Sequence, residues 1–408
     1  MNEKDDIKKV KNSNYLSARE SHKISRENRK TTKEFEKINK RKNVPESEYL
    51  TEMKNPKNVV EFENLHTYFF TDLGTVKAVN GVSFEVPQGK TVGIVGESGC
   101  GKSVTSLSLM KLVQRPQGQI VEGSIRFDLG DKVYDIAKTP INEMYKIRGN
   151  NISMIFQEPM TSLNPVFRIG TQIDEVITLH SMDVFHDSEE EEAKVVNNIK
   201  HSKAKKEIIK TRTIEMLDLV GIADSETVYN RYPHQLSGGM RQRVMIAMAI
   251  ACNPRLIIAD EPTTALDVTI QAQILDILRE LKDKINSSIM LITHDLGVIA
   301  GMADYVVVMY AGRIVERGTV YEVFKDPSHP YTQGLMAARP GVKRGQNRLY
   351  SIPGKVPNPI NMPDYCYFKD RCEKSIAACN GEFPCEIRLT ETHAVSCYLY
   401  SEDKNNND

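Results

Sequence analysis

The stretch Leu-Ser-Gly-Gly-Met at residues 236–240, followed by Arg-Gln-Arg at 241–243, is the most informative part of the chain because it lies between two other motifs. Upstream, residues 96–103 form a glycine-rich phosphate-binding motif, and downstream an apolar stretch ends in Asp260 and Glu261. Each flanking motif alone occurs in many nucleotide-binding proteins. The occurrence of all three motifs in this order greatly reduces the number of protein families to which the chain can belong.

The upstream motif matches G-x-x-x-x-G-K-S in full, after a predicted strand and before a predicted helix. Its residues are Gly96, Glu97, Ser98, Gly99, Cys100, Gly101, Lys102 and Ser103. Glycines let the backbone wrap a phosphate, so that consecutive N–H groups and the helix N-terminus face its oxygens. We expect Lys102 to reach the β- and γ-phosphates and Ser103 to ligate Mg²⁺.

Hydrolysis of a nucleoside triphosphate also requires a carboxylate for the metal and a group that positions the attacking water. Asp260 ends the apolar stretch 256–259, which places it beside the phosphate loop as a second Mg²⁺ ligand. Glu261 is one residue further on and is predicted to act as the base. Adjacent acids also occur at ordinary helix starts, but the apolar strand before this pair favours the catalytic interpretation.

Together, the three motifs resemble those of the ATP-binding cassette (ABC) ATPases. The resemblance implies that Gln157, after the apolar stretch 152–156, is the Q-loop residue, which is a third Mg²⁺ ligand and senses both the ion and the transporter. It implies that His294 is the switch histidine at the γ-phosphate. Taken without this context, a lone Gln or His at a strand end is more often an ordinary polar residue.

In the resembled family the signature loop serves the ATP of a partner cassette. Ser237 and Gly239, with Gly238 between them, are therefore expected to bind a γ-phosphate in trans, where helix N-terminal N–H groups form an anion site. Residues 265–267, which end in Asp267, resemble the D-loop that crosses between cassettes. Phe69 is our choice for the aromatic residue that stacks on adenine.

Two segments narrow the resemblance to importers. Residues 156–165, FQEPMTSLNP, look like the Q-loop of oligopeptide, dipeptide and nickel importer ATPases, and residues 329–332, HPYT, look like the start of their C-terminal extension. The match is best to the D-type ATPase subunit of an oligopeptide or dipeptide permease. A nickel or other small-solute importer is the alternative, and a soluble non-transport ABC protein is a remote one.

That family implies a set of partners and a location. They are a second, F-type ATPase subunit, two transmembrane permease subunits and, indirectly, an extracytoplasmic peptide-binding protein. The expected location is the cytoplasmic face of the cell membrane. The formal net charge of zero gives no reason to expect a nucleic acid partner, and no apolar run of transmembrane length occurs.

Five of the seven cysteines fall between residues 366 and 397. In the resembled extension, Cys366, Cys372, Cys379 and Cys397 match a recurring pattern that can hold a [4Fe–4S] cluster, and four thiolates also suit zinc. Cys385 is extra, which leaves the ligand set open. The alternative is a small domain with reduced thiols and no metal.

The predicted fold class is α/β: a P-loop ABC-type nucleotide-binding domain with a RecA-like core, an antiparallel β subdomain, a helical subdomain and a small cysteine-containing C-terminal extension. Residues 1–57 hold 16 basic against 10 acidic side chains and are predicted to be a disordered extension, with a basic arm that contacts anionic lipid or a partner as the alternative. The remaining predicted segments are the ATPase domain at 58–325, its helical subdomain at about 158–236, the extension at 326–400 and a disordered tail at 401–408.

Periodicity supports this division. Alternating apolar residues over 59–69 and 82–86 predict antiparallel strands. The stretches 256–259, 269–284 and 288–292 predict a strand, a helix and a strand of a parallel sheet. Between 157 and 232 the chain is predicted to be mainly helical, with the acidic run at 188–192 on a solvated face.

Overall fold

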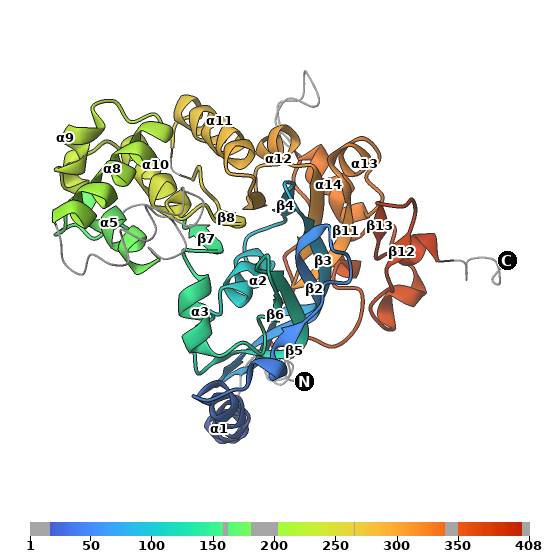
Figure 1. Ribbon diagram of the computed structural model, residues 1–408. Helices are drawn as coiled ribbons and strands as arrows, with labels where there is room; N and C mark the ends of the chain where they lie inside the picture. The colour runs from blue at the N-terminus through green and yellow to red at the C-terminus, as the bar shows by residue number, and fades with distance from the viewer. Residues whose placement is uncertain (1–16, 158–161, 181–202, 265, 339–349, 402–408) are drawn as a thin grey trace, which may run out of the picture.

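Two sheets and a group of helices make up the computed structural model of the chain (Figure 1). The structure describes residues 17–157, 162–180, 203–264, 266–338 and 350–401. The acidic run at 188–192 and the tail at 402–408 lie outside the described residues. Among the described residues, no helix is long and apolar enough to cross a membrane.

The larger sheet has the strand order β12-β13-β11-β10-β4-β9-β8-β7. Its strands are β4 (Thr91–Val95), β7 (Ile152–Ile155), β8 (Leu256–Asp260), β9 (Ser288–Ile292), β10 (Tyr305–Tyr310), β11 (Arg313–Thr319), β12 (Ile387–Arg388) and β13 (Ala394–Val395). The five from β10 to β7 are parallel. Strands β4, β8 and β9 are buried along their whole length, as expected for parallel strands covered on both faces. The predicted parallel sheet is thus confirmed.

The smaller sheet is antiparallel, with the order β1-β6-β5-β2-β3. Its strands are β1 (Leu50–Thr51), β2 (Asn58–Thr71), β3 (Gly74–Pro87), β5 (Gly118–Asp128) and β6 (Val133–Asp135). Strands β2 and β3 form the predicted antiparallel pair, and Phe62 lies opposite Phe84 with the two rings stacked 4.4 Å apart. Alternating burial along β3 shows why the period-two pattern was readable.

Helices cover the sheets and form a separate group at one side. The helices of the described residues are α1 (Ala18–Asn39), α2 (Lys102–Leu109), α3 (Ile141–Ile147), α5 (Ile169–Leu179), α8 (Lys203–Leu219), α9 (Ser225–Tyr229), α10 (Gly238–Ile250), α11 (Val268–Lys284), α12 (Leu296–Met302), α13 (Val320–Lys325) and α14 (Pro330–Ala337). Figure 1 shows α5, α8, α9 and α10 together, away from α2. Buried Ile173, Leu217 and Val244 belong to the core of this group. Over the described residues between 162 and 232, α5, α8 and α9 agree with the mainly helical character predicted there.

The prediction that residues 1–57 are disordered is wrong for the described part, 17–57. Helix α1 begins with a capping box between Ser17 and Glu20, which satisfies backbone N–H groups at its start. One face of α1 lies on the antiparallel sheet, where Asn28 Nδ2 donates to the Thr71 carbonyl at 2.6 Å. The capping residues and a narrow strip of contacts stabilise this helix, although its amino-acid composition predicted disorder.

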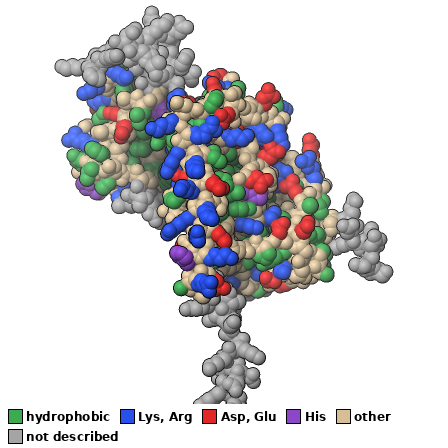
Figure 2. All heavy atoms as spheres, turned by 90° about the horizontal axis from the view of Figure 1, so that it is seen from below, with side chains coloured by type: hydrophobic (Ala, Val, Ile, Leu, Met, Phe, Trp, Pro, Cys, Tyr) green, Lys and Arg blue, Asp and Glu red, His purple; other side chains and the backbone are tan. Residues whose placement is uncertain are grey.

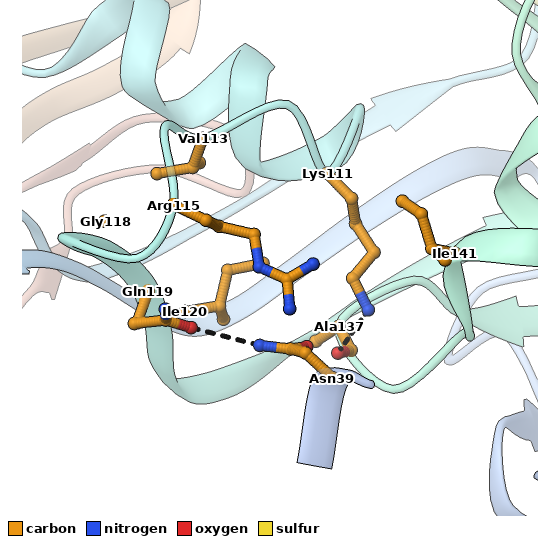
Figure 3. A pocket seen from close by; sticks show the side chains of 9 residues that line it. All are labelled: Asn39, Lys111, Val113, Arg115, Gly118, Gln119, Ile120, Ala137 and Ile141. Carbon is orange, nitrogen blue, oxygen red and sulfur yellow. Dashed lines mark hydrogen bonds between the residues drawn. The ribbon is translucent and has the colours of Figure 1, made fainter. Parts of the chain in front are cut away.

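The C-terminal end of α1 is fastened to the cassette in the same way. Asn39 Nδ2 donates to Gln119 Oε1 at 3.0 Å, beside a cavity of about 50 Å³ (Figure 3). Lys111 reaches the carbonyls of Ala137 and Thr139 from the other side of this cavity. These two hydrogen bonds hold the Lys111 amine in the junction, and burial lowers its pKa to about 8.

The outer face of α1 carries the basic residues of the extension. Figure 2 shows Lys and Arg side chains in a column on this side of the molecule. The exposed basic residues within α1 are Arg19, Lys23, Arg26, Arg29, Lys30, Lys33 and Lys37. This segment needs few apolar residues, because only one narrow face of α1 contacts the antiparallel sheet.

The C-terminal extension continues the larger sheet, since β13 pairs with β11 and β12 pairs with β13. Its junction with the cassette is centred on Glu316, which is fully buried. The Glu316 carboxylate accepts the backbone N–H groups of Ser328 and His329 and lies 2.8 Å from His393 Nε2. This hydrogen bond raises the pKa of His393 above its ordinary value, which favours a charge-assisted contact between sheet and extension.

Candidate active site

The phosphate loop joins β4 to α2 in a conformation that needs glycine. Gly96 and Gly101 have φ of 151° and 101°. A Cβ on Gly96 would lie 2.2 Å from the Met309 carbonyl oxygen, and one on Gly101 would lie 2.3 Å from that of Ala78. Because backbone atoms cannot move aside, both ends of the loop are fixed against neighbouring strands.

Lys102 and Ser103 begin α2 just after this loop. Lys102 is buried, and its Nζ donates to the carbonyls of Gly96 at 2.8 Å and Glu97 at 3.1 Å. Its ammonium therefore lies within the curve of the loop. Ser103 Oγ donates to Asp260 Oδ1 at 3.1 Å, which brings together two of the three predicted Mg²⁺ ligands. The third, Gln157, donates to the neighbouring Glu261.

Asp260 ends β8 and is almost completely buried. Burial raises the pKa of this carboxyl, while the hydrogen bond from Ser103 acts in the opposite direction. Oxygen ligands such as the Asp260 carboxylate and the Ser103 hydroxyl suit Mg²⁺, which takes few protein ligands and completes its shell with phosphates and water. The residues present therefore fit this ion.

Glu261 receives the three side chains that converge on the end of β8. Gln157 Nε2 donates to Glu261 Oε2 at 3.0 Å, and His294 Nδ1 lies 3.2 Å from Glu261 Oε1. Thr264 Oγ1 donates to the same carboxylate at 2.9 Å. The structure thus brings together Glu261, Gln157 and His294, the three residues predicted to be catalytic; Thr264 was not predicted.

Two further properties of Glu261 point to a special role. Its φ of 48° is in the left-handed region, which non-glycine residues rarely adopt. Burial would raise the pKa of its carboxyl, but the hydrogen bonds from His294 and Thr264 outweigh burial, and the pKa is lowered. The side chain is therefore ionised at neutral pH and aimed by its donors.

The signature stretch lies at the start of α10. Ser237 is the N-cap, and its hydroxyl accepts the Met240 N–H at 3.3 Å. A Cβ on Gly239 would lie 3.1 Å from Ile270, whereas one on Gly238 would meet nothing within 4 Å. The exposed N-terminus of α10 is in the helical group, apart from the chain's own α2 (Figure 1).

The neighbouring predicted residues take up related positions. Asp267 is the N-cap of α11 and accepts the Ile270 N–H at 3.0 Å, while residue 265 of the same predicted loop lies outside the described residues. Gln242 is buried and donates to the Pro262 carbonyl at 2.7 Å, which ties α10 to the segment after Glu261. Phe69 is half-buried on β2 beside Gly118; its contact with adenine stays a prediction.

Side chains of the C-terminal extension reach the phosphate loop, which the sequence did not indicate. Tyr331 Oη accepts the Glu97 N–H at 2.8 Å. Arg371 contacts the Glu97 carboxylate with two nitrogens, at 2.6 and 3.0 Å. No local motif could have revealed these contacts, because the partners are 234 and 274 positions apart.

The four expected metal-binding cysteines lie in the small extension without forming a metal site. Cys366, Cys379 and Cys397 are buried and Cys372 is partly buried. Among the described residues, no group of three or more Cys, His, Asp or Glu side chains is arranged to hold a metal ion. The expected [4Fe–4S] cluster or zinc ion is therefore not supported. Burial raises the pKa of Cys366 to about 12, which keeps it a neutral thiol, and Cys385 is exposed.

Comparison with known proteins agrees with this geometry. A family model described as "ABC transporter" matches residues 79–264, and one described as "Oligopeptide/dipeptide transporter, C-terminal region" matches residues 315–379. The oligopeptide transport ATP-binding protein AppD of Bacillus subtilis is 48% identical over 345 residues, which cover 85% of this chain and 98% of that protein. The dipeptide transport ATP-binding protein DppD of the same organism is 44% identical over 344 residues, 84% of this chain and 95% of that protein.

Solved structures show the same fold at lower identity. A dimeric ATP-binding cassette in a post-hydrolysis state, bound to ADP and Pi, superimposes with a TM-score of 0.52 at 24% identity. The match covers 64% of this chain and 98% of that one. The match to this structure covers less of the chain than the match to AppD, which covers 85%.

Proposed function

The chain belongs to the ATP-binding subunits of oligopeptide and dipeptide ABC importers, and from this membership we propose how its residues divide the work of hydrolysis. Its activity is hydrolysis of ATP coupled to peptide import. The observation that carries the assignment of roles is the convergence of Gln157 and His294 on the Glu261 carboxylate, beside the Ser103–Asp260 pair.

Different residues bind the phosphates and the adenine ring of ATP. The backbone N–H groups of the loop hold the phosphates, and Lys102 shifts from the loop carbonyls to the β- and γ-phosphate oxygens. Ser103 and Asp260 would hold Mg²⁺, and the bound ion would neutralise charge on the phosphates. Phe69 stacks on adenine.

Glu261 accepts a proton from the water that attacks the γ-phosphorus. The bond from that phosphorus to the β–γ bridging oxygen breaks, and the products are ADP and phosphate. Gln157 and His294 aim the carboxylate, and His294 donates to the γ-phosphate. Because Gln157 lies in the chain between β7 and α5 of the helical group, it also links hydrolysis to movement of that group.

The signature stretch of each cassette serves the partner's ATP. This chain has one phosphate loop and one signature stretch, so a complete site needs a second cassette, which we propose to be a related F-type subunit. The exposed Ser237 hydroxyl and the N–H groups at Gly238 and Gly239 then bind the γ-phosphate from the opposite side.

Substitution of Ser237 tests action in trans. We expect Ser237→Arg to leave ATP binding by this chain's own loop unchanged and to lower hydrolysis at the partner's loop about 100-fold or more, because γ-phosphate donors are lost and closure is blocked. The measurement is nucleotide binding by the separate subunit and ATPase activity of the assembled complex. Lys284→Ala, on the exposed surface of α11, is the control; loss of ATP binding by the separate Ser237→Arg chain would contradict the proposal.

The permease docks in a groove between the larger sheet and the helical group. The groove measures about 510 Å³, and its lining is mainly apolar. The residues that line it include Met110, Leu112, Met154, Phe156, Val176, Met245 and Met248. Phe156, 40% exposed, precedes Gln157 directly, so a membrane subunit seated here is next to the residue that touches Glu261. A chain docked in this way works at the cytoplasmic face of the membrane.

Leu112→Asp tests this docking site. Leu112 is 40% exposed at the groove and is absent from the ATP site. We expect copurification with the permease subunits to fall about tenfold or more, because an apolar anchor at the centre of an interface is replaced by a charge. Nucleotide binding by the separate chain should stay unchanged. Leu389→Asp, at a similarly exposed leucine of the C-terminal extension, is the matched control; equal effects of the two changes would reject the groove.

Transport itself is tested by uptake in cells that lack the gene for this chain. We expect loss of labelled oligopeptide or dipeptide uptake, restored by the intact chain but not by an inactive variant. Loss of nickel uptake with intact peptide uptake would support the small-solute alternative instead. The peptide-binding protein outside the membrane and the permease choose the cargo, so these assays are made on the whole system.

A further inference from the structure

Glu97, the second residue of the phosphate loop, is held by the C-terminal extension through its side chain and its backbone N–H, while its carbonyl accepts from Lys102 within the cassette. Its carboxylate forms a bidentate ion pair with Arg371, a two-pronged contact with Nη1–Oε2 at 2.6 Å and Nη2–Oε1 at 3.0 Å. Its backbone N–H donates to Tyr331 Oη at 2.8 Å. One residue of the loop thus has both its side chain and its backbone tied to elements that follow the cassette.

Arg371 is built into its place. Its side chain is 5% exposed, and its remaining N–H groups reach the carbonyls of Ile352 and Pro353 and the Tyr310 hydroxyl. The guanidinium also lies near the rings of Tyr310 and Phe368. The contact with Glu97 raises the pKa of Arg371 above its already high value, so it is charged at every relevant pH and cannot leave the pair by losing a proton.

The loop needs this support at Glu97. Gly96 and Gly101 are wedged against the carbonyls of Met309 and Ala78. Between them, Ser98 and Gly99 are exposed, and a Cβ on Gly99 would meet nothing within 4 Å. Glu97 is therefore the restrained residue next to the open part of the loop, where backbone N–H groups must all face one phosphate group.

We propose that Arg371 is a positioning residue for ATP binding: through Glu97 it fixes the first turn of the phosphate loop in the shape that receives the phosphates. This inference rests on the ATPase function proposed above. The extension, on this view, is part of the ATP site of its own cassette and supplies binding energy by pre-organising the loop. Because Arg371 does not touch the reacting atoms, its loss affects ATP affinity more than the chemical step.

The test uses the assembled transporter with Arg371→Lys, Glu97→Gln and the double variant. Lysine keeps the charge but cannot make the two-pronged contact. We expect each single change to raise the KM for ATP about tenfold, the loss of one charge-assisted hydrogen bond. The value of kcat should stay within about twofold. The double variant should show the KM of either single variant, because both changes break the same contact.

Arg317→Lys is the matched control. Arg317 is also a largely buried arginine of this region, with a two-pronged contact to Glu386 at 2.8 Å and 2.8 Å, but it does not touch the phosphate loop. We expect it to lower the melting temperature without changing the KM for ATP. A purely structural role of Arg371 predicts the same result for Arg371→Lys, and that result would overturn the proposal.

Other outcomes are equally decisive. A double variant whose KM rises by the product of the two single-variant factors would also overturn the proposal. So would an unchanged KM in Glu97→Gln. If the unaltered complex itself failed to hydrolyse ATP, the proposed function would fail instead, so the two failures are distinguishable. Direct nucleotide binding to the separate full-length chain gives a second readout: affinity should fall by the same factor as KM rises.

Discussion

Replacement of Glu261 by Gln is expected to abolish steady-state ATP hydrolysis while ATP binding persists. The amide has the size of the carboxylate and can keep its contacts with Gln157 and Thr264, but it cannot accept a proton from water. Loss of a positioned general base lowers rates by about 10²–10⁴-fold. The measurement is phosphate release by the assembled transporter, with nucleotide affinity measured in parallel.

A closed cassette dimer that holds ATP should accumulate in this variant, because the step that opens it is blocked. Glu280→Gln, at an exposed position of α11, makes the same chemical change away from the site and should hydrolyse ATP normally. Normal turnover by Glu261→Gln in the complex would remove Glu261 from its assigned role. The left-handed φ of 48° would then need another explanation.

Replacement of Lys102 by Ala is expected to act one step earlier, on ATP binding itself. The buried Nζ is held by the carbonyls of Gly96 and Glu97, so it lies within the curve of the phosphate loop before ATP arrives. Charge-assisted hydrogen bonds contribute roughly 1.5–3 kcal/mol each. Loss of contacts to two phosphates should therefore weaken ATP binding about 100-fold or more.

Titration of the separate chain with ATP measures this effect, and a melting curve with and without ATP checks it independently. Wild-type protein should be stabilised by saturating ATP, whereas the Lys102→Ala protein should not, because ligand stabilisation follows affinity. Lys284→Ala removes the same charge from an exposed helix and should bind ATP like the wild type. ATP-induced stabilisation of Lys102→Ala equal to that of wild type would refute the assignment of Lys102.

Two predictions from the sequence, disorder of the N-terminal extension and a metal site at the cysteines, do not agree with the structure. The basic extension was predicted to be disordered because its apolar residues are few, yet α1 needs only one narrow contact face, held by Asn28 and Asn39. The cysteines show the opposite error. Their spacing resembles a metal-binding pattern, but spacing along a chain does not determine the distances between sulfur atoms in the fold, and the described residues hold no such group.

Features that are encoded in short segments of the chain could be predicted from residue type alone. Glycines at 96 and 101 are required by the local backbone, and buried parallel strands appear as apolar runs, so the phosphate loop, β8 and α10 could be predicted from residue type and spacing. The predicted roles of Asp260 and Glu261 followed from their position at the end of such a run. Motif order then indicated the family.

Contacts between side chains that are far apart in the sequence became visible only in the folded chain. The carboxylate of Glu261 receives Gln157 from 104 positions upstream and His294 from 33 positions downstream, and Glu97 receives Arg371 from 274 positions away. These contacts depend on the parallel alignment of β7, β8 and β9 and on the addition of β13 to the sheet edge. Local sequence encodes backbone conformation, whereas contacts of this kind arise from packing of the whole chain, and for that reason they could not be inferred from any single segment.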